Sequence, residues 1–243
     1  MRQEDAALIE RIMQRHPQIA IVRAITRRQF GTVIAYDGKR ALLRLHDFLL
    51  VEGPVDESFA AAMRGALRAG TYLTSSNRLW YEATPAAPAL VPERRMRALY
   101  TWTDRDRGRQ IVEQDGVAVT AIRAGDKAEI RALKWAEGVF DSYRDDRHHT
   151  AAGFGYCVRT GGRIVSLCTS FCDGPDGVEI EVDTDPDHQG RGFARLACKH
   201  FLAECVDRAV TPLWDASNEA SERLAASLGF EKTLDYESLH FNE

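Results

Sequence analysis

The sequence predicts a mixed α/β fold, with one sheet region of parallel and antiparallel strands covered by helices on both faces. In residues 178–184, apolar and acidic residues alternate, which is the period-2 pattern of a strand with one buried face. From Gln189 the chain passes through two glycines into a segment with apolar residues at helical spacing. Strand-like and helix-like segments also alternate along residues 117–241. These observations indicate an α/β protein whose core lies between a sheet and its helices.

The first 108 residues are expected to form a smaller α/β domain. A helix is predicted over residues 3–15, because apolar residues recur at helical spacing before Pro17. Asp37-Gly38 marks a hairpin between two strands. A second helix is predicted over residues 56–69. The predicted strands of this part cover residues 19–22, 31–35, 41–45, 48–51 and 98–102.

Residues 109–243 are expected to form a second, larger domain after the hydrophilic run that ends at residue 109. The predicted order is a strand (117–122), a helix (126–140), a polar loop (141–151), three strands (154–159, 163–171 and 178–184), a helix (190–207), a strand (211–215), a helix (218–228) and a last strand (230–241). In the last helix, Gly229 follows the apolar stripe and is the expected left-handed stop.

Composition favours a globular enzyme of the cytoplasm. Of the 243 residues, 44% are hydrophobic and 28% are charged. No secretory signal is visible, and no apolar run reaches the ~20 residues that a membrane span needs. The five cysteines are an odd number without a second metal-type pair, so we expect buried free thiols and neither a metal site nor a cysteine nucleophile.

Charge is divided unevenly along the chain. Residues 1–110 hold 18 basic and 12 acidic residues, whereas residues 111–243 hold 14 basic and 24 acidic residues. An acidic catalytic half favours a cationic amine substrate by electrostatic steering. The basic residues of the first half are scattered and match no nucleic-acid-binding motif. Nucleic acid is therefore not an expected partner, although tRNA is left open.

The turn after residue 188 carries the strongest functional signal. Gly190 and Gly192 lie where the chain enters a helix, so little side chain covers the first backbone N–H groups. Those donors and the positive end of the helix dipole form a site for a phosphate or pyrophosphate. The segment lacks the Gly-Lys-Ser/Thr of a Walker loop and the third glycine of a dinucleotide fingerprint.

The run Gln189-Gly190-Arg191-Gly192-Phe193-Ala194 resembles the acyl-CoA loop, Q/R-x-x-G-x-G/A, of the GNAT superfamily of N-acetyltransferases. Residues 214–221, followed by Leu228-Gly229-Phe230, resemble the second motif of that superfamily. This second motif is most similar to a longer branch grouped with the zwittermicin-resistance acetyltransferase. The resemblance covers residues 112–243 and extends faintly over the first half.

The resemblance implies acetyl-CoA, or another acyl-CoA, as co-substrate and no metal. In this family the sheet splays after the carboxylate-bearing strand, and pantetheine enters the gap. Backbone groups of residues 182–184 then pair with pantetheine, the glycine loop holds pyrophosphate, and Asn218 bonds the pantetheine arm. The cofactor-binding residues implied are Val182, Asp183, Thr184, Gln189, Gly190, Arg191, Gly192, Phe193, Ala194, Asn218 and Ser221.

Glu179 and Glu181 are the candidate general bases that would deprotonate the acceptor ammonium. Both lie on the polar face of the strand beside the loop, and a neighbouring carboxylate raises the pKa of its partner. Glu179 has the family's usual Glu-Ile context, and a bulge would favour Glu181 instead. Ala225 stands where many relatives carry a tyrosine that protonates the thiolate. Tyr236, another side chain or water would replace it, or the thiolate leaves unassisted.

The acceptor is left open by the sequence. Residues 140–150 contain acidic residues and two histidines. The resemblance implies that this loop covers the acceptor site. The alternative is that its polar residues serve solubility alone. The N-terminal domain is acceptor-side or accessory. We expect an N-acyltransferase acting on a small-molecule amine, such as an antibiotic or a biosynthetic intermediate. The alternatives are an acyl carrier protein or an aminoacyl-tRNA as donor, and a CoA-binding module without catalysis.

Overall fold

The computed structural model describes residues 1–28, 30–84, 90–109, 111 and 114–242. The chain forms two compact units. Unit 1 comprises Met1–Arg97, Gly174–Asp176 and Leu234–Glu243, and unit 2 comprises Ala98–Asp173 and Gly177–Thr233. This division differs from the boundary expected near residue 108, because the last strand carries the end of the chain back into unit 1. The roles assigned to the two predicted domains stay predictions.

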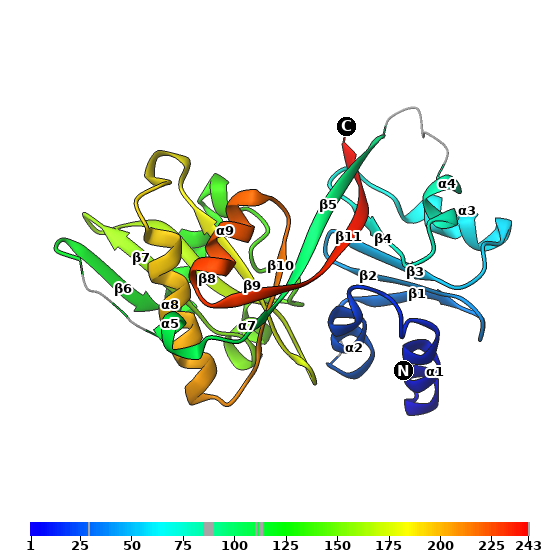
Figure 1. Cartoon of the computed structure of the whole chain (residues 1–243), viewed down its shortest axis with the longest axis horizontal. Coiled ribbons are helices and arrows are strands. Elements are labelled where there is room, and N and C mark those ends of the chain that lie inside the picture. Colours follow the sequence, from blue (N-terminus) through cyan, green and yellow to red (C-terminus); the bar gives the residue numbers. More distant parts are fainter. Residues whose placement is uncertain (29, 85–89, 110, 112–113, 243) are drawn as a thin grey trace. The chain divides into compact units, whose positions relative to one another are not determined.

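Unit 1 is a small sheet with helices on two faces. Its elements are α1 (Gln3–Ile12), α2 (Ile19–Arg28), β1 (Thr32–Tyr36), β2 (Ala41–Leu45), β3 (Phe48–Glu52), α3 (Glu57–Ala66), β4 (Tyr72–Thr74) and α4 (Leu79–Glu82). The strands lie in the order β1-β2-β3-β4, followed by the end of the last strand, β11 (Phe230–Asn242). Strands β3 and β4 pair in parallel, whereas β1–β2, β2–β3 and β4–β11 pair antiparallel. Helices α1 and α2 lie on one side of these strands and α3 and α4 on the other (Figure 1).

The strand predicted over residues 19–22 is wrong, because these residues form the first turn of α2. Ile21, Val22 and Ile25 are buried, which is the stripe of a helix that presents one face to the core. A window of four apolar residues has no visible period, so it cannot distinguish a buried strand from a buried helix turn. The short strand β4 and the short helix α4 were not predicted.

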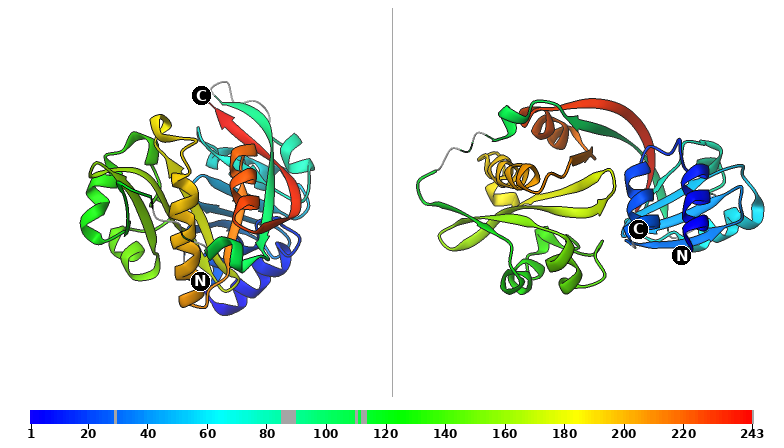
Figure 2. Two further views of the ribbon diagram at one scale, coloured as in Figure 1. Left: turned by 60° about the vertical axis from the view of Figure 1, so that its left-hand side comes forward. Right: turned by 90° about the horizontal axis from the view of Figure 1, so that it is seen from below.

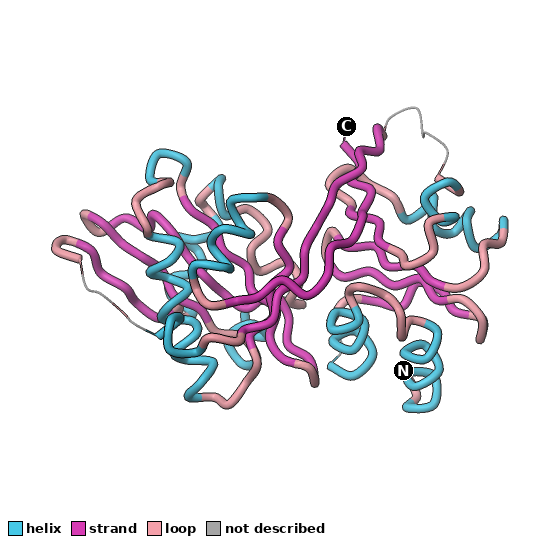
Figure 3. Tube along the Cα trace, viewed as in Figure 1, coloured by secondary structure: helices cyan, strands magenta, loops and turns pink. Residues whose placement is uncertain are grey.

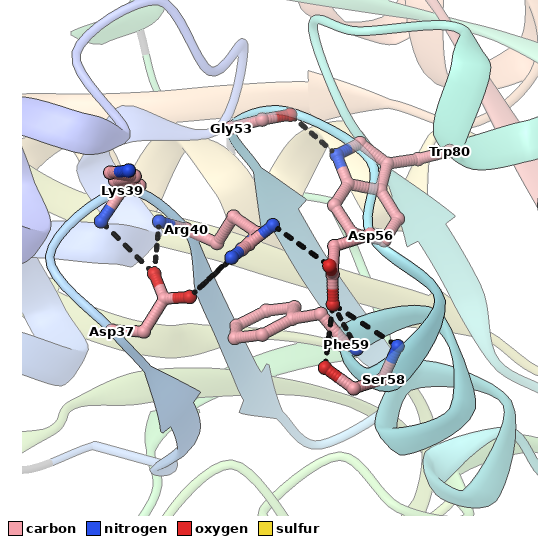
Figure 4. Close-up of polar contacts among 8 residues, drawn as sticks. All are labelled: Asp37, Lys39, Arg40, Gly53, Asp56, Ser58, Phe59 and Trp80. Atoms are coloured by element: carbon pink, nitrogen blue, oxygen red, sulfur yellow. Dashed lines mark hydrogen bonds and ion pairs between the residues drawn. The ribbon is translucent and has the colours of Figure 1, made fainter.

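The predicted hairpin at Asp37-Gly38 is confirmed, because β1 and β2 pair antiparallel on either side of it. The Asp37 carboxylate accepts from the backbone N–H groups of Lys39 and Arg40. The guanidinium of Arg40 lies 2.8 Å from Asp37 and 3.6 Å from Asp56, which caps α3 (Figure 4). The indole N–H of Trp80 donates to the carbonyl of Gly53 in the same region. This network joins the β1–β2 turn to the start of α3.

Unit 2 is the larger sheet and contains the glycine loop. Its elements are the end of β5 (Val91–Trp102), α5 (Arg105–Arg109), β6 (Val117–Ala121), the 3-10 helix η1 (Ala124–Asp126), α6 (Lys127–Arg131), η2 (Lys134–Ala136), α7 (Asp146–Ala152), β7 (Gly155–Thr160), β8 (Arg163–Gly174), β9 (Gly177–Thr184), η3 (Pro186–His188), α8 (Phe193–Asp207), β10 (Pro212–Ala216), α9 (Glu219–Ser227) and the start of β11. The strand order is β5-β10-β9-β8-β7-β6. Both β5 and β11 are long, continuous strands (Figure 3).

Apolar side chains pack on both faces of the unit 2 sheet. Helices α8 and α9 cover one face, where Phe201, Trp214 and Leu228 join a common core. Residues of α6, η2 and the following turn cover the opposite face, where Ile130 and Phe140 pack on β7 and β8. The right-hand view of Figure 2 shows α8 and α9 on one side of these strands and the helices of residues 124–152 on the other. The predicted mixed α/β layering is therefore present.

The continuous helix predicted over residues 126–140 is wrong. The segment forms η1, α6 and η2, with extended backbone at Leu133 and a positive φ of 80° at Gly138. These breaks let Ile130, Ala136 and Phe140 reach one core from short turns. Part of the predicted polar loop forms the helix α7, which Asp145 caps.

The five cysteines are buried free thiols, as the sequence predicts. Burial raises the pKa of Cys157 to about 12, so this thiol stays neutral and packs as a small apolar group. No helix within the described ranges combines the length and the apolar character that crossing a membrane requires.

Gly229→Ala is expected to destabilise unit 2 by about 1–3 kcal/mol. Gly229 has a φ of 88°, and an added Cβ would lie 2.3 Å from the Asp104 carbonyl oxygen. Gly125→Ala is the control, because a Cβ at Gly125 meets nothing within 4 Å and the backbone there lacks a positive φ. Urea-induced unfolding of both variants measures the difference, and equal stabilities would contradict the strain assigned to Gly229.

Candidate functional site

Strand β9 presents an apolar face and an acidic face, as the alternation predicts. Val178, Ile180 and Val182 join the core beneath α8. Glu179, Glu181 and Asp183 alternate with them and therefore face the opposite side of the sheet. The 3-10 helix η2 lies against β9.

Strands β9 and β10 run parallel and then part. Pro212 pairs with Val178 and Leu213 pairs with Glu179. Beyond these pairs β9 continues to Thr184 and β10 to Ala216, and no further pair joins them within the described residues. Glu179 thus stands at the point where the two strands stop pairing, and the edge of β9 beyond it faces a gap in the ladder.

The direction of the backbone groups decides which residues of β9 face that gap. The Val178 N–H donates to the carbonyl of Thr211 before β10, whereas the Asp185 N–H donates to Val165 of β8. Adjacent residues of a strand direct their backbone groups to opposite edges. Ile180, Val182 and Thr184 therefore offer N–H and C=O groups toward β10.

The backbone carbonyl of Asp183 points toward β8, away from the gap, whereas the sequence led us to expect that it pairs with pantetheine. Its carbonyl oxygen accepts from the Ser166 hydroxyl at 2.9 Å, on the β8 side of the strand. Ser166 also lies 2.8 Å from the Thr184 hydroxyl. The block of residues 182–184 expected from the sequence does not include Ile180, whose backbone faces the gap, because the alternation of backbone direction becomes visible only once the neighbouring strands are known.

The glycine loop forms an open cradle at the start of α8. Gly190 has a φ of 73° and Gly192 a φ of 83°, and a Cβ built at either would meet nothing within 4 Å. Gly192 is the N-cap of α8 and provides no side-chain cap. The first helical bond runs from Leu196 N–H to the Gly192 carbonyl, so the preceding N–H groups have no partner in the helix.

The remaining loop residues are divided between the core and the surface. Phe193 is buried against the sheet, so only its backbone can contact a ligand. Gln189 and Arg191 are exposed, and the Arg191 guanidinium donates to the carbonyl of Asp187 at 3.1 Å. Arg195, one turn further, donates from Nε to the Ser227 hydroxyl at 3.2 Å. The open cradle therefore offers backbone donors, and Arg191 and Arg195 are the basic residues in and directly after it in the sequence.

The acidic face of β9 is partly buried. Glu179 is only 8% exposed. Burial, together with the nearby Glu179 carboxylate, raises the pKa of Cys172 well above its usual range, so this thiol beside Glu179 is neutral. Burial raises the pKa of Asp183 to about 6. Asp183 on the acidic face can therefore exchange a proton near neutral pH.

The second predicted motif forms the start of α9. The Asn218 side chain caps the helix by accepting from the Ser221 N–H at 2.9 Å, as predicted, while its amide Nδ2 contacts the Ser217 hydroxyl at 3.3 Å. The Ser221 hydroxyl accepts from the Trp214 indole N–H at 3.0 Å. This bond fixes β10 to α9 at the far side of the gap.

No proton donor stands at position 225, where many relatives carry the tyrosine that protonates the thiolate. Ala225 is fully buried in the core under α9. Tyr236, one predicted substitute, belongs to unit 1, where its hydroxyl accepts from Arg97 Nε at 3.1 Å and from the Gln18 amide. Tyr236 is therefore buried within unit 1, where its hydroxyl is held by Arg97 and Gln18.

The predicted acceptor loop is anchored by a buried polar network. The Tyr143 hydroxyl donates to Ser170 Oγ at 2.7 Å, and His149 Nε2 lies 2.9 Å from Thr169 Oγ1. Burial lowers the pKa of His149 to about 3, so this imidazole is neutral and packs against the rings of Phe140 and Tyr143. Arg131 pairs with Asp141 and Asp146.

The loop nevertheless lies close to the acidic face. The Ser142 hydroxyl donates to the carbonyl of Phe171 on β8, one residue before Cys172, which lies beside Glu179. These bonds hold the loop against β8, which is the neighbour of the acidic strand β9 in the sheet.

Asp183→Asn is expected to raise the free energy of unfolding at pH 8 by of order 2 kcal/mol. The folded-state pKa of about 6 exceeds the unfolded value of 3.8, so Asp183 costs stability as the pH rises through this interval. At pH 4 most of this cost is absent, because Asp183 is protonated in the folded state and nearly half protonated in the unfolded state, so the variant should lie close to the wild type. The exposed Asp187→Asn is the control. Urea unfolding at pH 4 and pH 8 tests this sign, and a difference that is independent of pH would contradict it.

Comparisons with known proteins agree on one family. The family model for GNAT acetyltransferase matches residues 10–239. The uncharacterized N-acetyltransferase YdfB from Bacillus subtilis is 36% identical over 86 residues, which is 35% of this chain. The match spans 33% of that relative, so it covers about a third of the relative's length.

Solved structures share the fold over nearly the whole chain. A GCN5-related N-acetyltransferase-like protein from Streptococcus suis superposes with a TM-score of 0.87 at 21% identity, covering 98% of this chain and 99% of that one. A GCN5-related N-acetyltransferase from Kribbella flavida has a TM-score of 0.56 at 15% identity, covering 96% and 95%. The structural matches confirm the predicted mixed α/β fold, and the family match confirms the predicted class of enzyme, an acetyltransferase.

Proposed function

This chain belongs to the GNAT acetyltransferase family, and we propose on that premise that it transfers an acetyl group from acetyl-CoA to the amine of a small molecule. One observation carries the proposal most directly. An uncapped helix with an open glycine cradle begins immediately after an acidic strand, and that strand parts from β10 at Glu179. Open glycines at a helix start, the end of pairing between two strands and a buried carboxylate lie along one stretch of chain, and this supports an acyl-CoA site there.

The donor would occupy this stretch from the cradle toward Glu179. Backbone N–H groups of residues 190–194 and the α8 dipole would hold the pyrophosphate. Pantetheine would lie as an added strand along β9, bonded to Ile180, Val182 and Thr184. The free amide hydrogen-bonding capacity of Asn218, across the gap, supports a further contact to its arm.

The reaction requires the acceptor to lose a proton before attack. Glu179 would accept that proton from the ammonium, and the resulting amine would attack the thioester carbonyl. A C–N bond forms, the C–S bond breaks, and the electron pair leaves with the CoA sulfur. The nitrogen loses a second proton, which balances the protonation of the thiolate to the thiol. Thiols have a pKa near ~8.5, so the thiolate is a fair leaving group without the tyrosine that Ala225 replaces.

The acceptor proposed is a cationic small molecule. Residues 111–243 hold 24 acidic against 14 basic residues, and the acidic face of β9 has the sign that attracts an ammonium. The similarity of the α9 motif to the zwittermicin-resistance branch favours an antibiotic or a biosynthetic intermediate as the acceptor. We propose that the N-terminal part of the chain contributes to the choice of acceptor.

Calorimetric titration with acetyl-CoA, followed by a thiol-release assay over a library of amines, tests the proposal. We expect binding of acetyl-CoA and thiol release that depends on a particular amine. Absence of acetyl-CoA binding would refute the proposal. Binding without turnover on any amine would favour the alternative of a CoA-binding module.

A further inference from the structure

We propose that two copies of this protein associate through strand β6, which pairs antiparallel with the same strand of a second copy. The inference is independent of the acetyl transfer proposed above. Strand β6 is the outer strand of unit 2, and within the residues that the structure describes it pairs only with β7 (Figure 1). Its other edge is a row of backbone groups that can pair with a further strand.

The edge of β6 lacks the features that keep sheet edges from pairing. Its five residues are all uncharged, none is proline, and its register with β7 runs from Val117 to Ala121 without a bulge. Strand β1, at the edge of unit 1, instead has a register shift between Val33 and Ala35. Charged residues, prolines and bulges normally protect an edge strand, so β6 is open to a partner.

The backbone groups of β6 point alternately toward β7 and toward the outer edge. The Ile122 N–H donates to the Gly155 carbonyl of β7, so Thr120 and Ala118 also direct their backbone groups toward β7. The residues with outward backbone groups are Val117, Val119 and Ala121.

Full overlap of the two strands fixes their register, because an antiparallel contact between identical strands is symmetric about one residue. The centre of β6 is Val119, which then lies opposite Val119 of the second copy, while Val117 lies opposite Ala121. These are the residues with outward backbone groups. Each Val119 N–H therefore meets a Val119 carbonyl, and each Ala121 N–H meets a Val117 carbonyl. The Val117 N–H is bonded to Gln114 within its own chain.

The side chains that this register brings together are apolar. Val117 and Val119 are partly buried and pack against the core beneath α8. Because side chains alternate along a strand, Ala121 lies on the same face. Cross-strand pairs of Val119 with its own copy and of Val117 with Ala121 extend that apolar layer across the contact.

The charges that flank β6 favour the antiparallel orientation. Asp115 precedes the strand and Arg123 follows it, and both are exposed. Each stands the same number of residues from Val119, so the register brings Asp115 of each copy to the strand end where Arg123 of the other copy lies. A parallel pair would bring like charges together, which is destabilising.

Sedimentation velocity of the full chain between ~1 and ~500 µM tests the inference, because a five-residue strand pair belongs to the class of small, transient interfaces, with an expected dissociation constant of order 10–100 µM. Arg123→Asp should weaken the dimer by ~10-fold or more, because two opposite-charge contacts become like-charge contacts. Combining it with Asp115→Arg reverses both charges and should restore the wild-type dissociation constant. Arg15→Asp, the same charge change at an exposed residue of unit 1, is the matched control and should leave that constant unchanged.

Val119→Lys should abolish the dimer over the whole concentration range, because it places two ammonium groups opposite each other at the centre of the contact. Val119 is partly buried, so circular dichroism must show that this variant is folded, and the exposed Arg123→Asp decides the question if it is not. A wild type that remains monomeric at the highest concentration would overturn the inference. A dimer that Arg123→Asp leaves unchanged, or a double variant that dimerises no better than Arg123→Asp alone, would overturn it as well.

Discussion

Gly192→Asp is expected to weaken the binding of acetyl-CoA by ~100-fold or more, which is at least ~2.7 kcal/mol of binding free energy. Gly192 has a φ of 83° and nothing occupies the space above it within 4 Å, so a new carboxylate would project where the pyrophosphate is proposed to lie. Repulsion between the two anions and loss of the open cradle act together. Calorimetric titration with acetyl-CoA measures the change.

The control for Gly192→Asp is Gly162→Asp. Gly162, in the β7–β8 turn of unit 2, has a φ of 80° and equally open space around its Cβ position. Both variants therefore introduce the same backbone strain and the same charge, and only one does so at the cradle. If Gly192→Asp keeps wild-type affinity, or if Gly162→Asp loses as much, the assignment of the cradle is wrong.

Glu179→Gln is expected to lower kcat/KM for an amine acceptor by ~10²-fold while the affinity for acetyl-CoA stays nearly unchanged. Glutamine keeps the size and the polar contacts of the side chain, but it cannot accept the proton of an ammonium. Glu179 is 8% exposed, so bulk water does not readily take its place. The deficit should shrink as the pH approaches the amine pKa of ~10, because the acceptor then loses its proton to solvent.

Glu181→Gln provides the comparison for Glu179→Gln. The same strand face carries both carboxylates, but Glu181 lies beyond the last pair between β9 and β10. A large loss of turnover in Glu181→Gln, with wild-type turnover in Glu179→Gln, would transfer the role of base to Glu181. A variant at Glu179 with unaltered pH dependence would remove it from the mechanism.

Elements with a clear local period were predictable. Strand β9, helix α8 and helix α9 agree with the predicted segments within a few residues, because alternation, the paired glycines and the Asn218 cap are encoded within a single element. Residues 19–22 and 126–140 were mispredicted for the converse reason. Their apolar residues fit more than one local structure, and packing against the sheet chose a helix in the first case and broken turns in the second.

The sequence by itself determined that an acidic strand leads through Gly190 and Gly192 into a helix, because side-chain period and glycine conformation act over a few residues. Only the tertiary structure decided which backbone and side-chain groups of that stretch are left unpaired by neighbouring strands and open to solvent. The separation of β9 from β10 after Glu179, the backbone direction that favours Ile180 over Asp183, and the contact of Arg195 with Ser227 all join segments distant in sequence. Strand pairing and burial are set by partners elsewhere in the chain, so no local pattern contains them.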